Sequence, residues 1–178
     1  MPTVRGVHFQ PVSYFGRFPG GVPRNEDRIN LSDIIIALER QTGGEIKVDD
    51  IVPRKRYDPH CAFSSLFYLS EEGKLHALTE KRQNRSLDEK TDFARRTNAF
   101  TNAHWRLPVA GEKESSFLRR LRHYTLAISG MGVQDVGNID LGRLKGCCVH
   151  VVTTANRMVP LCAFHFTSSK GERLYKNG

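Results

Sequence analysis

A run of glycine and proline near the start of the chain divides the sequence more sharply than any other feature. Residues 15–23 hold three glycines and two prolines, so no regular helix or strand can continue through them. Before this run, residues 4–12 mix β-branched and aromatic side chains, a pattern typical of one strand that leads into a loop. We therefore expect a division into residues 1–24, with a single strand that lacks a sheet, and residues 25–178.

Helical and hairpin patterns alternate beyond this division. Asn30 or Ser32 can cap a helix that Gly43-Gly44 ends, because apolar residues recur at helical spacing at Leu31, Ile34, Ile35 and Leu38. Further helices are expected from Ser86 to about Ala99 and over residues 117–124. Residues 62–69 and 74–78 predict a β-hairpin around the turn at residues 70–73. This mixture of helices and hairpins predicts a small α+β domain.

A second hairpin is expected near the end of the chain, over residues 147–164. If residues 153–157 form a five-residue turn, Val152 faces Met158 and His150 faces Pro160. Two residues further from the turn along each strand, Cys148 would lie opposite Cys162. Directly opposed side chains have Cβ atoms about 5 Å apart. Cys147 would point to the other face, since successive side chains of a strand alternate.

The cysteines are the residues with the clearest chemical potential. Without a secretory signal, four cysteines are core thiols, metal ligands or catalytic groups more often than disulfides. Four thiolates suffice for a tetrahedral metal or an iron–sulfur cluster, although no C-x2-C pair is present. The candidate metal ligands are Cys61, Cys147, Cys148 and Cys162. We assign no catalytic acid or base, because the histidines are scattered and no nucleophile or phosphate-binding motif occurs.

The charge of the chain is basic but unevenly distributed. There are 27 Lys and Arg against 19 Asp and Glu, which gives +8, and most of the excess lies in residues 81–123 and 143–178. Basic residues among acidic neighbours are typical of a solvated helix face, so we do not expect a nucleic-acid partner. No apolar run approaches the roughly 20 residues that span a bilayer, so we expect a cytoplasmic protein without a membrane partner.

Several separated motifs together resemble the C-terminal half of radical SAM iron–sulfur proteins, nearest to the radical SAM (seleno)protein TrsS family and more distantly to tetraether lipid synthases. The resemblance covers nearly the whole chain. The matching stretches are residues 5–17, 28–44, 59–61, 128–135, 147–151 and 160–164.

The resemblance implies a catalytic radical SAM barrel upstream, as part of the same reading frame or as a separate chain. It also implies that the matching cysteines bind an auxiliary cluster of the 4Fe–4S type, and that residues 1–24 are the remnant of the last barrel strand and its linker. S-adenosylmethionine would bind only in a complete enzyme, because this chain lacks the C-x3-C-x2-C triplet. The family's further cysteine shortly before Cys61 is also absent, since residues 56–60 read Arg-Tyr-Asp-Pro-His.

We therefore expect the C-terminal auxiliary-cluster region of a radical SAM enzyme, which supports the substrate site of an upstream barrel and is not catalytic alone. The competing hypothesis is a metal-free or zinc-stabilised binding module that uses the basic face of residues 81–123 for an anionic partner.

Overall fold

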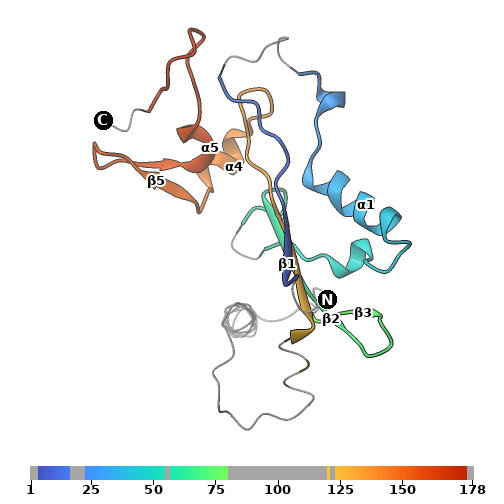
Figure 1. Cartoon of the computed structure of the whole chain (residues 1–178). Coiled ribbons are helices and arrows are strands. Elements are labelled where there is room, and N and C mark those ends of the chain that lie inside the picture. The colour runs from blue at the N-terminus through green and yellow to red at the C-terminus, as the bar shows by residue number, and fades with distance from the viewer. Residues whose placement is uncertain (1–3, 17–22, 55–56, 80–119, 121–122, 176–178) are drawn as a thin grey trace. The chain divides into compact units, whose positions relative to one another are not determined.

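A computed structural model describes residues 4–16, 23–54, 57–79, 120 and 123–175. Helices and strands are mixed, which confirms the α+β class (Figure 1). The strands are β1 (Gly6–Phe9), β2 (Ala62–Leu69), β3 (Leu75–Ala77), β4 (Thr125–Met131), β5 (His150–Val152) and β6 (Met158–Pro160). The α-helices are α1 (Leu31–Gln41), α4 (Leu141–Lys145) and α5 (Leu161–Phe164), and short 3-10 helices lie at Asn25–Asp27 and Val48–Asp50.

Four strands form one sheet in the order β1-β4-β2-β3. The predicted hairpin of residues 62–78 is confirmed, because β2 and β3 pair antiparallel with Tyr68 opposite His76. The expectation that the N-terminal strand lacks a sheet is wrong. β1 pairs with β4, and the Ala127 N–H donates to the Arg5 carbonyl at 2.9 Å. This partner lies more than a hundred residues away in the sequence, so the local pattern of residues 4–12 carries no sign of it.

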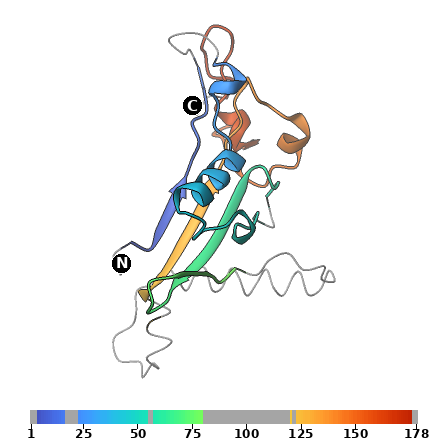
Figure 2. The same cartoon turned by 90° about the vertical axis from the view of Figure 1, so that its right-hand side faces the viewer.

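The core beside this sheet centres on β2. Phe63 and Phe67 are almost completely buried, and the buried Ser65 hydroxyl accepts a hydrogen bond from the Val52 N–H at 3.0 Å. α1 runs alongside the sheet in two views at right angles (Figures 1 and 2). Burial of the aromatic side chains and the hydrogen bond to the Ser65 hydroxyl both favour this packing.

α1 begins and ends as the sequence predicts. The Asn30 Oδ1 atom accepts from the Ser32 and Asp33 N–H groups at 2.8 and 3.1 Å, and Asp33 accepts from the Asn30 N–H in return. Gly43 and Gly44 have φ angles of 62° and 83°, the left-handed conformation that ends helices and favours glycine.

The chain divides into two compact units, each built from three separate segments. One unit comprises Met1–His8, Ile35–Val52 and Phe63–Ser129, and the other comprises Phe9–Ile34, Pro53–Ala62 and Gly130–Gly178. The expected division into residues 1–24 and 25–178 stays a prediction. It concerns the origin of the two segments, a barrel remnant and an auxiliary domain, and the two compact units do not test that origin.

The helix expected from Ser86 to Ala99 lies outside the described residues, as does most of the helix expected over residues 117–124. Within the described ranges, no helix has the length and apolar character that crossing a membrane requires.

Candidate metal centre

A pocket in the second unit gathers the four cysteines. Its empty volume is about 420 Å³, which includes space open to solvent. Three parts of that unit contribute side chains: the turn before β2, the end of β4 with the loop after it, and the segment from α4 to α5. The described lining residues are Tyr57, Asp58, Cys61, Met131, Gly132, Val133, Arg143, Gly146, Cys147, Cys148, Val149, Leu161 and Cys162. We call this the thiol pocket.

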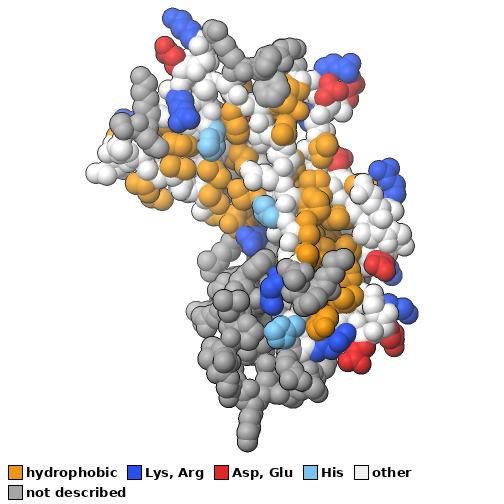
Figure 3. Space-filling model, in the orientation of Figure 1, with side chains coloured by type: hydrophobic (Ala, Val, Ile, Leu, Met, Phe, Trp, Pro, Cys, Tyr) orange, Lys and Arg blue, Asp and Glu red, His pale blue; other side chains and the backbone are white. Residues whose placement is uncertain are grey.

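The β5–β6 hairpin carries the register predicted from its five-residue turn. Val152 pairs with Met158 and His150 pairs with Pro160, both as expected. Figure 3 shows hydrophobic side chains over this hairpin, and Val152 and Met158 are among the exposed ones.

The expected cross-strand pair of Cys148 and Cys162 is wrong. Pairing ends at Pro160, and Cys162 lies in α5, which starts at Leu161. α5 starts directly after Pro160, so the two-residue periodicity of the strand does not continue to Cys162. The Leu161 N–H still donates to the Val149 carbonyl at 2.9 Å, and both cysteines line the thiol pocket.

Polar contacts distinguish the sulfur atoms from one another. Cys61 Sγ accepts from the Arg143 Nη2 atom at 3.0 Å, and the buried Cys162 Sγ accepts from the Gln134 N–H at 3.3 Å. Cys147 Sγ donates to the Val149 carbonyl at 3.2 Å, and Cys148 is exposed. Two of the sulfurs are therefore already hydrogen-bond acceptors, as metal-bound thiolates are.

The thiols also influence one another electrostatically. Burial raises the pKa of Cys162, and negative charge on Cys147 and Cys61 raises it further. The hydrogen bond from the Gln134 N–H and the charge of Arg143 act in the opposite direction but do not outweigh these effects. Cys162 therefore holds its proton more tightly than an ordinary cysteine, even with the Arg143 charge in the pocket.

The donor set fits a soft metal or an iron–sulfur cluster in its chemistry, because four cysteines line one pocket. Across the described ranges, however, no three His, Cys, Asp or Glu side chains are already gathered at metal-binding geometry. In particular, the Cys147 thiol would have to turn from the Val149 carbonyl to reach a shared ion. The assignment of Cys61, Cys147, Cys148 and Cys162 as metal ligands therefore stays a prediction.

Sequence reasoning missed the charged residues of the thiol pocket. The Asp58 Oδ1 atom accepts from the His60 N–H and lies 2.9 Å from His60 Nδ1 and 3.5 Å from Arg143 Nε. The hydrogen bond from the His60 backbone, helped by the His60 ring and the Arg143 charge, keeps the pKa of Asp58 below its usual range despite the opposing effect of burial. Only the proximity of Asp58 to Cys61 in the sequence could have drawn attention to it.

A buried ion pair lies beside the loop that follows β4. Burial alone would raise the pKa of Asp135, but hydrogen bonds from Arg28, the Tyr14 N–H and the Gly137 N–H, together with the Arg28 charge, lower it. The Arg28 Nη1 atom is 2.8 Å from Asp135 Oδ2, and the Arg28 guanidinium also lies over the Tyr14 ring. Asp135 thus serves as the counter-charge of Arg28 in the described structure.

Comparison with known proteins supports a relationship to radical SAM enzymes. No family model matches the chain. The chain is similar to the 7,8-dihydro-6-hydroxymethylpterin dimethyltransferase of Methanocaldococcus jannaschii, with 26% identity over a 214-residue alignment. The alignment covers 92% of this chain but only 42% of that protein, so the chain spans less than half the length of its relative.

Proposed function

We propose that the chain is the auxiliary-cluster region of a radical SAM enzyme, and that Cys61, Cys147, Cys148 and Cys162 hold a 4Fe–4S cluster in the thiol pocket. The observation that carries this proposal is the convergence on one pocket of cysteines from the turn before β2, the segment before β5 and α5. The similarity to part of a longer enzyme supports the same function.

A cluster in the thiol pocket supplies a redox centre whose potential depends on hydrogen bonds to its sulfurs and on solvent exposure. The residues of the chain contribute the rest: Cys61 and Cys162 present sulfurs with hydrogen-bond donors in place, and the apolar Met131, Val133 and Leu161 limit the access of water. Cys148 is the exposed member of the set.

The catalytic partner in this proposal is an upstream radical SAM barrel that binds S-adenosylmethionine. The chain has no C-x3-C-x2-C triplet of its own, so it starts no radical reaction alone. The relative is named for a methyl transfer to a pterin, and a substrate-shaping role beside such a barrel is the contribution that we propose for this region.

The decisive experiment is anaerobic reconstitution of the purified chain with iron and sulfide, followed by metal analysis and visible absorption. We expect about four irons per chain and the broad charge-transfer absorption of a cluster. Changing Cys61 or Cys162 singly to alanine should lower the iron content strongly, whereas Ser169→Ala, at an exposed position, should not.

The outcomes separate the hypotheses. A colourless chain that holds zinc after the same treatment supports the zinc-stabilised alternative, and a metal-free fold supports the plain binding module. Iron content that is unchanged in all the single cysteine variants would contradict the ligand assignment. Binding of an anionic partner through basic residues should weaken steeply between about 50 and 200 mM salt, while cluster content should not change.

A further inference from the structure

Arg143 is the cationic side chain among the described residues that line the thiol pocket. Its Nη2 atom donates to Cys61 Sγ at 3.0 Å, and its Nε atom lies 3.5 Å from Asp58 Oδ1. In the described part of the chain, that Nε atom is buried and makes no hydrogen bond. The guanidinium thus faces a sulfur with one edge and a carboxylate with another.

A series of hydrogen bonds holds Arg143 at this position. α4 starts after Asp140, whose Oδ1 atom accepts from the Gly142 and Arg143 N–H groups at 2.8 and 3.1 Å. The Asp140 N–H donates to the side-chain oxygen of the buried Gln134 at 2.6 Å, and the Gln134 N–H donates to Cys162 Sγ. The segment that carries Arg143 is therefore fixed to one sulfur of the pocket while Arg143 itself contacts another.

The charge of Arg143 also acts beyond its direct contact. Its guanidinium lies in the pocket that all four cysteines line. A site built from several thiolates accumulates negative charge, and the apolar residues around it cannot offset that charge. A fixed guanidinium inside the pocket offsets part of it.

We infer that Arg143 is a positioning residue of this centre, which orients the Cys61 sulfur and stabilises the more reduced state of the bound group. The inference rests on the function proposed above. Groups that hydrogen-bond to metal ligands typically change metal affinity by about 10–100-fold when removed. Hydrogen bonds and charges at cluster sulfurs also set the reduction potential.

The test uses the whole chain, loaded anaerobically with iron and sulfide, and the variants Arg143→Met, Arg143→Lys and Arg157→Met. Methionine keeps the apolar stem without the charge, and lysine keeps the charge without the planar fork. Arg157 lies exposed in the turn between β5 and β6, so Arg157→Met removes the same charge from the surface. The readouts are the reduction potential and the rate of iron release to a chelator.

We expect Arg143→Met to release iron about tenfold faster or more and to have a more negative potential, because loss of a cation disfavours the added electron. Arg143→Lys should keep a potential near that of the wild type but release iron faster. Arg157→Met should match the wild type in both measurements.

Unchanged potential and release rate in Arg143→Met would overturn the role of Arg143 and leave the proposed cluster standing. A wild-type chain that takes up no iron would overturn the proposed function and this inference with it. If Arg143→Met does not fold, as judged by circular dichroism, Arg143→Lys decides: release at the wild-type rate overturns the inference, and faster release supports it.

Discussion

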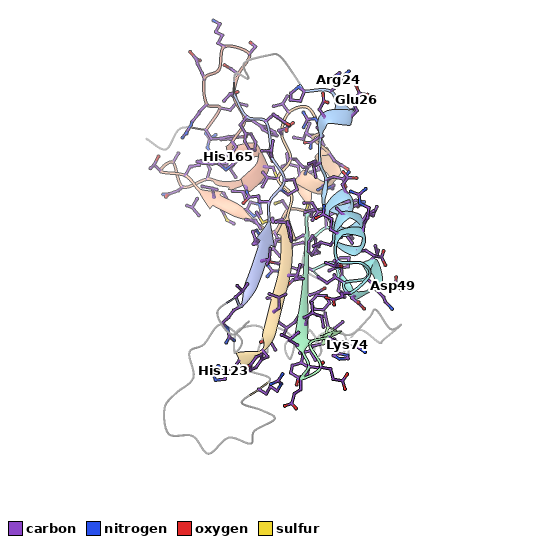
Figure 4. All side chains as sticks on the ribbon, turned by 45° about the vertical axis from the view of Figure 1, so that its right-hand side comes forward. Arg24, Glu26, Asp49, Lys74, His123 and His165 are labelled. Carbon is purple, nitrogen blue, oxygen red and sulfur yellow. The ribbon has the colours of Figure 1, made fainter. Side chains whose placement is uncertain are left out.

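At the scale of single residues, the stability of the second unit depends on an ion pair that is buried away from water. The Asp135 side chain is 1% exposed and its partner Arg28 is 12% exposed, whereas Arg24 and Asp27 form an ion pair at the surface. Figure 4 labels Arg24 beside Glu26, with which it also pairs. A buried charge that loses its partner cannot be resolvated, so the two kinds of ion pair should respond differently to mutation.

Asp135→Asn should therefore destabilise the chain by about 3–5 kcal/mol, because the Arg28 charge would remain buried without its counter-charge. The matched control, Asp27→Asn, should cost less than about 1 kcal/mol. Urea denaturation followed by circular dichroism measures both, and similar midpoints for the two variants would contradict the role of the buried pair.

The same variant should change the response to acid. The pKa of Asp135 is lower in the folded chain than in the unfolded chain, so its contribution is complete above the ordinary carboxyl pKa of about 4 and is lost as the pH falls through the folded value. Asp135→Asn should thus lose stability less steeply than the wild type below about pH 4.

At the scale of elements, local signals predicted local structure. The five-residue turn set the register of β5 and β6, and the Asn30 cap with Gly43 and Gly44 set the ends of α1. The same reasoning failed at Cys162 because strand periodicity was extended past Pro160, where the strand ends and α5 starts.

Asn30→Ala should cost about 1 kcal/mol, because the Ser32 and Asp33 N–H groups would lose their acceptor at the start of α1. Ser32→Ala changes an exposed neighbour in the first turn and is the matched control. Equal denaturation midpoints for the two variants would show that the Asn30 cap does not stabilise the helix.

At the scale of the whole molecule, long-range pairing limited what the sequence could predict. The four cysteines were candidates from composition and resemblance, but Arg143 and Gln134 belong to the site only because distant segments meet there. Likewise, nothing local in residues 4–12 indicates that β4 pairs with β1. Contacts of this kind depend on tertiary packing, which periodicity and turn chemistry do not encode.

Loading of the thiol pocket should stabilise the whole unit that contains it, because a group that binds only the folded chain shifts the unfolding equilibrium. The reconstituted chain should melt several degrees above the chelator-treated chain in anaerobic calorimetry. A double variant with Cys61→Ala and Cys162→Ala should show no such difference. An equal difference in that variant would place the stabilising metal elsewhere.

The order in which the pocket's segments occur in the sequence also governs its biogenesis. A ribosome makes Cys61 long before it makes α5, so a growing chain carries an incomplete thiol set throughout synthesis of the intervening residues. In the function proposed above, delivery of iron and sulfide has to wait for Cys162, and exposure of the nascent thiols to an oxidant can damage the site before it has formed.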